Sequence, residues 1–241
     1  MLARAVPPWD AREMRYARPY PGRRLLGRPV LESWDKAGSS SQTRLTRFLD
    51  TIADDGSGLA EPLAMDLVIA LPEGISRTGG GHDLDNYLLP IVRRLGHQRF
   101  VAVFARKVDA TAGDSGSTLA VETARPAGHD AQAPQLTCRT RAAGQSIAWK
   151  RDVATACSAC SPASLPDGPI ALQIHYRLSG RRNWAQQWKP TIDALGAVLG
   201  IPDPAHPYNP RDDRIVDLAL SRTIDEALGW DIELEISWQN L

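Results

Sequence analysis

The stretch that decides the fold is Pro62–Leu71, PLAMDLVIAL, which has a counterpart in Pro169–Leu178, PIALQIHYRL. Each stretch contains an apolar run of the length that is typical of a β-strand. The second begins 107 residues after the first, and both start with proline and end with leucine. Two similar strands at a fixed spacing indicate an internal repeat.

The segments around these two strands follow the same order. In the first half we expect a helix over 41–54, the strand, a helix from about Asp83 to Leu95 that Gly96 ends, and strands over 99–106 and 118–124. In the second half we expect a helix over 146–160, the strand, a helix over 184–199 that Gly200 ends, and strands over 214–221 and 231–238. Both halves therefore read helix, strand, helix, strand, strand.

Residue identities support the repeat, and the spacing between the copies changes only in loops, where insertions are tolerated. After the first glycine loop the spacing is 100, which pairs Pro90, Leu95 and Gly96 with Pro190, Leu195 and Gly196. Further on it is 115, which pairs Arg99-Phe100-Val101 with Arg214-Ile215-Val216. The sequence therefore predicts an α+β pseudo-dimer: two tandem repeats in one chain, each a small mixed sheet with helices on one side.

Composition divides the chain and excludes some classes of protein. We expect an arginine- and proline-rich arm over 1–30, a first repeat over 31–126, a linker over 127–135 and a second repeat over 136–241. Lys+Arg and Asp+Glu are equal at 28 each, so net charge alone does not indicate nucleic-acid binding. No run approaches 18 apolar residues, which indicates no membrane partner. Three cysteines and no apolar export segment favour the cytoplasm, as a monomer or weak homodimer.

The stretch GGGHDLDNYLLP, residues 79–90, contains the most distinctive polar pattern. Asp83 and Asp85 stand two apart where a loop leads into the expected helix. Carboxylates at that place either cap the helix or hold a divalent metal, and the spacing alone allows both. Cys157 and Cys160 have metal-ligand spacing but lack a second pair, which favours ordinary thiols over a zinc site. The arginines of the N-terminal arm suit either phosphate contacts or packing along the domain.

The second half resembles the RusA family of Holliday-junction resolvases, and the first half does so more thinly. Three segments of the second half carry the resemblance: Ala143-Gly144-Gln145 with Trp149–Ala154, Asn183–Leu195, and Asp212–Asp217. The middle one fits the family pattern D-x-D-N-x-x-K-x-x-x-D-A-L, except that both leading aspartates are replaced. The first half supplies them, because His82-Asp83-Leu84-Asp85-Asn86 is similar to the family's R-D-L-D-N.

The resemblance implies a Mg²⁺-dependent endonuclease that acts on branched or duplex DNA. It implies that Asp83, Asp85, Asp213 and Lys189 are catalytic and that Asp212 joins the three aspartates as a metal ligand. It further implies DNA contacts for a basic and polar set: His82, Asn86, Arg181, Arg182 and Lys189. Phosphodiester hydrolysis needs a metal for the water and the phosphate charge, and a lysine can stabilise the developing negative charge.

The motif is, however, divided between the two halves. At the spacings above, Asp213 corresponds to Gln98 and Lys189 to Leu89. Each family site is taken to lie within one subunit, so two incomplete halves are not expected to combine into one good site. Three arrangements remain open: a single altered site on the first half, to which Asp66 could contribute, a composite site, or a catalytically inactive module that binds DNA or another protein.

Overall fold

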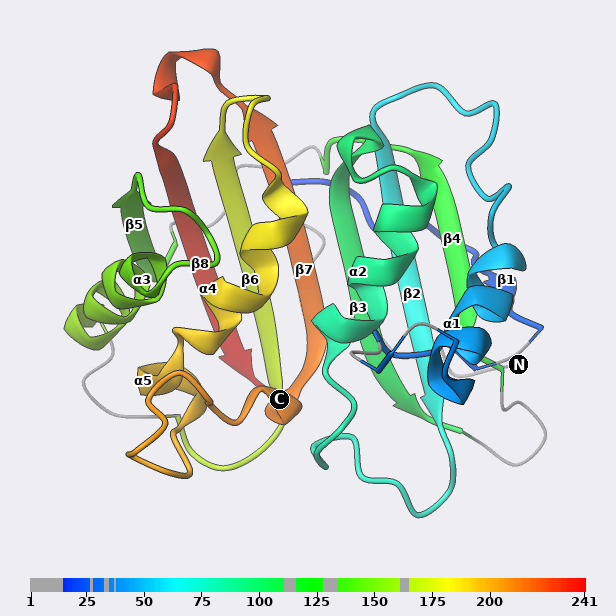
Figure 1. Cartoon of the computed structure of the whole chain (residues 1–241), viewed down its shortest axis with the longest axis horizontal. Coiled ribbons are helices and arrows are strands. Elements are labelled where there is room, and N and C mark those ends of the chain that lie inside the picture. Colours follow the sequence, from blue (N-terminus) through cyan, green and yellow to red (C-terminus); the bar gives the residue numbers. More distant parts are fainter. Residues whose placement is uncertain are drawn as a thin grey trace.

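The centre of the fold is one mixed β-sheet of eight strands in the order β1-β4-β2-β3-β7-β6-β8-β5 (Figure 1). This computed structural model describes residues 15–26, 28–32, 35–36, 38–110, 116–127, 134–160 and 165–241. The strands are β1 (Arg23–Arg24), β2 (Leu63–Leu71), β3 (Phe100–Asp109), β4 (Thr118–Thr123), β5 (Leu136–Thr140), β6 (Ile170–Leu178), β7 (Ile215–Ile224) and β8 (Ile232–Asn240). The expected two small sheets are thus one sheet, because β3 and β7 pair antiparallel at its middle.

The α-helices cover one face of this sheet (Figure 1). They are α1 (Ser40–Asp50), α2 (Leu84–Leu95), α3 (Ile147–Cys160), α4 (Trp188–Asp193) and α5 (Gly196–Leu199). Short 3-10 turns are η2 (His97–Arg99), η3 (Trp184–Gln187), η4 (Asp212–Arg214) and η5 (Glu226–Leu228). Within the part of the chain that the structure describes, no helix is long and apolar enough to cross a bilayer.

The pairing on one side of the β3–β7 junction matches the pairing on the other. On the first side β2 is parallel to β3 and antiparallel to β4, and on the second side β6 is parallel to β7 and antiparallel to β8. Both parallel pairs shift register after their first residue, at Leu63/Ala64 and at Ile170/Ala171. The strand starts keep the spacings of 107 and 115 that the sequence analysis uses.

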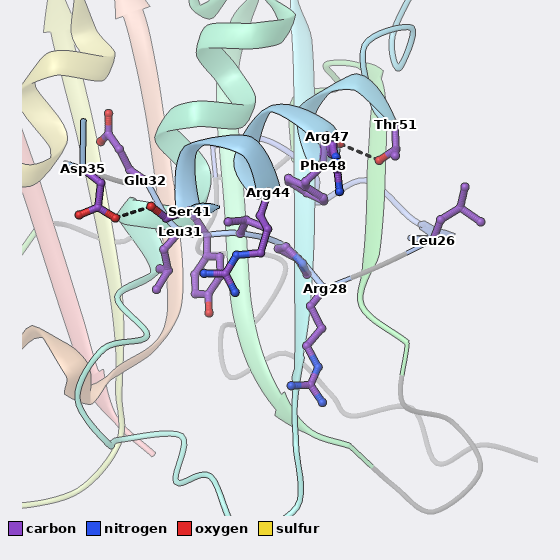
Figure 2. A pocket seen from close by; sticks show the side chains of 13 residues that line it. Leu26, Arg28, Leu31, Glu32, Asp35, Ser41, Arg44, Arg47, Phe48 and Thr51 are labelled. Atoms are coloured by element: carbon purple, nitrogen blue, oxygen red, sulfur yellow. Dashed lines mark hydrogen bonds between the residues drawn. The ribbon is translucent and has the colours of Figure 1, made fainter. Parts of the chain in front are cut away.

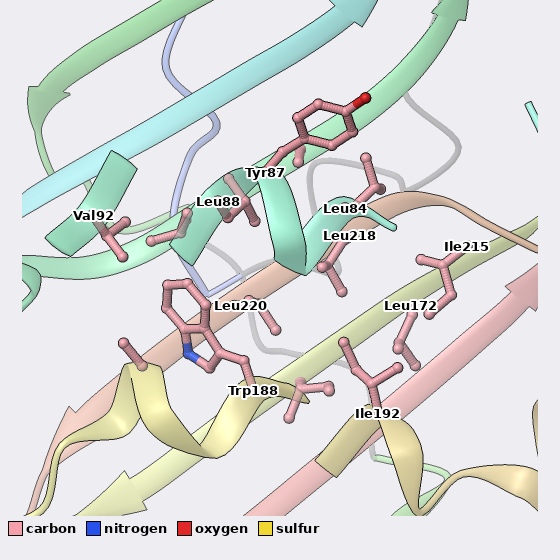
Figure 3. Close-up of a cluster of buried hydrophobic side chains, with 14 of the residues drawn as sticks. Leu84, Tyr87, Leu88, Val92, Leu172, Trp188, Ile192, Ile215, Leu218 and Leu220 are labelled. Carbon is pink, nitrogen blue, oxygen red and sulfur yellow. The ribbon is translucent and has the colours of Figure 1, made fainter. Parts of the chain in front are cut away.

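The hydrophobic core runs without interruption from one side to the other. Residues of β2 alternate between the two faces, so Met65 and Leu67 join the core under the helices while Ala64 lies in the smaller cluster on the opposite face. Figure 3 shows the residues where the sides meet, with α2 against α4 and β7: Leu84, Leu88, Val92, Trp188, Ile192, Leu218 and Leu220. The sheet and the helices therefore enclose one shared core.

Two parts of the secondary structure differ from the expectation. The helix expected over 184–199 is divided into η3, α4 and α5, because Leu195, with φ −86° and ψ 29°, leaves the helical conformation between the last two. Pro190 lies in the first turn of α4, where a missing N–H costs no helical hydrogen bond. The edge strands β1 and β5 were not expected, since a strand of two residues and one of five leave little pattern in a sequence.

The described part of the N-terminal arm packs against the sheet. Arg15 pairs with Glu235 of β8, and Arg18 pairs with Asp66 of β2 and Asp217 of β7. The backbone N–H of Ala17 also donates to the carbonyl of Arg125 at 2.8 Å. Of the two roles expected for the arm, packing is the one observed from residue 15 onward, and the arm's earlier arginines lie outside the described residues.

Candidate functional site

The acidic residues of the two halves meet at one end of the sheet. Asp83 is the N-cap residue of α2 and Asp85 lies in its first turn, whereas Asp212 and Asp213 form η4 directly before β7. The strands β2 and β3 are parallel and β7 is antiparallel to β3, so β2 ends at the same end of the sheet at which β7 begins. The topology therefore brings residues 83 and 85 toward residues 212 and 213.

Two lysines hold this acidic group together. Lys189 of α4 donates to the carboxylate of Asp212 and lies 3.3 Å from a carboxylate oxygen of Asp193. Lys107, near the end of β3, donates from Nζ to the backbone carbonyl of Asp213 at 2.8 Å. These contacts connect β3, η4 and α4, so the second half contributes carboxylates and both halves contribute a lysine.

Burial makes both aspartates of α2 reluctant to ionise. Burial raises the pKa of Asp85 to about 7; the Lys189 ammonium opposes this, while Asp212 and Asp83 add to it. Burial likewise raises the pKa of Asp83, with Asp212 adding to the effect and Lys189 opposing it. The carboxylates of the two halves are thus close enough to repel one another, which is the electrostatic mark of a site made for positive charge.

The two lysines respond to these carboxylates differently. Burial lowers the pKa of Lys107 to about 8, although Asp83 and Asp213 favour its charged form. Burial also acts to lower the pKa of Lys189, but its three acidic neighbours Asp85, Asp212 and Asp193 outweigh burial and raise it. The sequence analysis did not identify Lys107. Its signal was a lysine at a position that follows Val103 and Ala105 in the inward alternation of β3.

The capping interpretation of the aspartate pair does not describe Asp83. Its backbone is extended, as an N-cap residue requires, but its side chain makes no capping hydrogen bond. Instead, one carboxylate oxygen accepts from Nδ2 of Asn86 at 3.1 Å. Asn86 therefore orients the carboxylate of Asp83, which leaves Asp83 available to the site.

The donor set fits a hard divalent cation in the type of its atoms. All four acidic side chains offer oxygen, which Mg²⁺ prefers, and Oδ1 of Asp213 is buried without a hydrogen-bond partner among the described residues. In the same part of the chain, no three His, Cys, Asp or Glu side chains are gathered tightly enough to hold a metal ion as they stand. Lysine ammonium groups occupy the positive positions of the site instead.

The opposite end of the sheet holds the corresponding positions and no acidic site. There Arg222, the counterpart of Lys107, donates to the backbone carbonyl of Gln98, the counterpart of Asp213, and from Nε to the carbonyl of Phe100 at 2.8 Å. Trp184 closes this end by donating from Nε1 to the carbonyl of His97 at 3.1 Å. Asn183 and Ala185 stand where the other end has Asp83 and Asp85.

This arrangement corrects the expectation that the two incomplete halves could not combine. Gln98 follows α2, so that helix separates it from Asp83 at the other helix end, and a twelve-residue helix is about 18 Å long. A site built within the first half alone would therefore have its two parts at opposite ends of the sheet. Of the arrangements left open, the composite one is the one that this topology permits.

The residues expected to contact DNA are only partly gathered at the acidic site. His82 adjoins Asp83, and its Nδ1 lies 2.8 Å from the hydroxyl of Tyr87. Arg181 and Arg182 instead follow β6 and lie at the opposite end of the sheet, where Arg182 donates to the carbonyl of Ala142 and Arg181 is exposed. The structure therefore separates these two arginines from the acidic site.

The cysteines have the properties of ordinary thiols. Cys138 and Cys157 are buried and Cys160 is exposed, and all are free. Burial raises the pKa of Cys157 to about 11, which keeps it protonated and unreactive near neutral pH.

Comparison with known proteins adds no relative to this description. No family model matches the chain, and neither a curated protein nor a solved structure matches it.

Proposed function

We propose that this chain is a cytoplasmic, monomeric, Mg²⁺-dependent endonuclease that binds branched DNA and has one composite catalytic site. The observation that carries the proposal is the meeting of Asp83 and Asp85 with Asp212, Asp213 and Lys189, which lie more than a hundred residues away in the chain. These are the residues that the resemblance to the RusA family singles out. Their proximity depends on the topology of the sheet and was not an input to that resemblance.

The matched pairing on the two sides of the sheet supports a tandem duplication folded as a pseudo-dimer. In that interpretation β3 and β7 form the contact between the two copies, and each end of the sheet corresponds to one site. One end has the aspartates and lysines, and the other has Asn183, Ala185 and Gln98. A chain with one such site cuts one strand for each binding event, so we propose that it nicks DNA.

The roles follow from charge and position. Asp83, Asp85, Asp212 and Asp213 would hold Mg²⁺, which when bound activates water and neutralises phosphate charge. Lys189 and Lys107 bring positive charge to the same place, where a phosphodiester would gain negative charge during hydrolysis. Asn86 keeps Asp83 oriented, and His82 lies beside it at the edge of the site.

The test is a cleavage assay on a four-way DNA junction with a different fluorescent label on each strand. With Mg²⁺ we expect single nicks, and we expect Asp83→Asn and Asp213→Asn each to lower the rate by roughly 100-fold or more, because each removes a charged oxygen ligand. Asp203→Asn is the matched control, since Asp203 is exposed and contacts only Ala205 and His206. Paired cuts on two strands by one chain would contradict the single site.

One observation favours a second candidate, a catalytically inactive module that binds DNA or another protein on the same fold. Lys189 already neutralises Asp212, and the described residues contain no group of carboxylates gathered for a metal. A lysine that replaces the metal would leave binding intact and remove hydrolysis. Junction binding without any nicking, at every Mg²⁺ concentration and equally in wild type and Asp213→Asn, would select this candidate.

A further inference from the structure

A deep pocket beside the acidic site is lined by arginines and apolar side chains. It has a volume of about 810 Å³ and lies between α1 and the segment 28–32. Figure 2 shows Arg28 and Arg44 pointing away from α1, with Asp35 and Ser41 at one end of the pocket and Leu26 at the other. A pocket of this size accommodates a ligand of a few hundred daltons.

The positive charge of this pocket is not balanced by the protein. Arg28, Arg44 and Arg47 are exposed and form no ion pair with any described residue. The pocket's two acidic residues are otherwise engaged: Glu32 pairs with Arg93, which lies outside the lining, and Asp35 accepts a hydrogen bond from Ser41. Exposed arginines in one concave place, without carboxylate partners, suit an anionic ligand.

The walls of the pocket are apolar. Leu31, Phe48 and Tyr87 line it, and Leu26 stands at its rim with 90% of its surface exposed. Phosphate alone would gain nothing from such walls, whereas a nucleotide has a phosphate for the arginines and a flat base for the apolar surface. Grooves that bind single strands combine these two features.

The pocket continues toward the acidic site. A second cavity, of about 170 Å³, shares Arg28, Pro29 and Tyr87 with the first and is lined by His82 as well. His82 precedes Asp83, and its ring stacks parallel to that of Tyr87 with centroids 6.3 Å apart. A ligand that runs through both cavities would therefore reach the residues that we propose to be catalytic.

We propose that these two cavities form one groove that binds a single nucleic-acid strand leading into the acidic site. This inference rests on the proposed function, because it identifies the part of the DNA that the nuclease holds. Arg28, Arg44 and Arg47 contact successive phosphates, and a base lies against Leu31 and Phe48. The preferred substrate is then a junction or flap with an unpaired strand next to the cut.

The test measures binding by fluorescence anisotropy in EDTA, so that it does not depend on cleavage. The ligands are a labelled 12-nucleotide single strand and a blunt duplex, each over a series of salt concentrations. We expect Arg44→Gln/Arg47→Gln to weaken single-strand binding at least about tenfold. It should also reduce the slope of log affinity against log salt by about 1.4, since two phosphate contacts are lost. Duplex binding should change much less.

The control is Arg141→Gln, because Arg141 is also exposed and without an ion pair among the described residues but follows β5 at the other edge of the sheet. Three results would overturn the inference: an unchanged single-strand affinity in the double variant, an equal loss in Arg141→Gln, or equally tight binding of a free mononucleotide. Loss of nicking in Asp213→Asn with intact single-strand binding would support both proposals. Single-strand binding that needs the arginines, in a protein that never nicks, would refute only the nuclease.

Discussion

At the scale of single residues, the most deeply buried ion pairs lie on the face of the sheet away from the helices. Asp66 of β2 and Asp217 of β7 share Arg18, whose Nη1 lies 3.3 Å from Oδ1 of Asp66. Arg106 adds a weaker contact to Asp66 at 3.9 Å. Asp66 therefore faces away from Asp83 and Asp85, and the expectation that it could complete a metal site with them is wrong for this reason.

The buried Asp66 predicts a pH dependence of stability. Burial raises its pKa from 3.8 to about 6, although Arg18 opposes the shift. Between these two values the folded protein keeps a proton that the unfolded chain has released, so the free energy of unfolding falls as the pH rises. We expect Asp66→Asn to gain stability relative to wild type by up to about 3 kcal/mol between pH 4 and pH 7.

Urea denaturation at several pH values measures this difference. Because Asp85 also has a raised pKa, the wild-type curve alone does not identify the responsible group, and the comparison with the variant is needed. If the wild type and Asp66→Asn lose stability in parallel from pH 4 to pH 7, Asp66 is not the titrating residue.

At the scale of the elements, the junction between the two sides depends on more than the β3–β7 ladder. Trp184 of η3 donates to the carbonyl of His97 in η2, and the guanidinium of Arg222 lies 5.3 Å from the Trp184 ring centre. Trp188, the next buried tryptophan, packs against Trp184 with ring centroids 4.8 Å apart, but its own Nε1 has no hydrogen-bond partner among the described residues.

This pair of tryptophans offers a matched experiment. Trp184→Phe and Trp188→Phe remove similar apolar volume, but only the first removes a hydrogen bond between the two sides. We therefore expect Trp184→Phe to lower the free energy of unfolding by about 1 kcal/mol more than Trp188→Phe does. Equal losses, measured by chemical denaturation, would mean that the Trp184 bond contributes nothing to the junction.

At the scale of the whole molecule, the shared core and the continuous sheet predict that both halves unfold together. The β3–β7 pairing and the α2–α4 packing give neither side a core of its own. Far-UV circular dichroism reports on all strands and helices, whereas fluorescence reports mostly on the second half, which holds five of the seven tryptophans. We expect coincident transitions by the two probes. Separate transitions would show that the halves are independent domains.

Local patterns explain why most of the elements could be predicted from the sequence. Apolar runs of strand length and helical spacing depend on neighbouring residues, and the glycines after the helices mark their ends. The helix over 184–199 was wrong because its break at Leu195 has no sequence signal comparable to glycine or an interior proline. The acidic residues were found individually, through the resemblance, while Lys107 was missed because a single strand lysine has no motif.

The sequence by itself determined which segments are strands and helices, that they recur in one order, and which side chains have the chemistry of a metal site. Only the tertiary structure decided that Asp83 and Asp85 meet Asp212, Asp213 and Lys189, and that Gln98 lies at the far end of α2. The physical reason is that secondary structure follows from local periodicity. Proximity between distant residues depends instead on the direction in which β3 and β7 pair, and that antiparallel pairing is selected by the shared core.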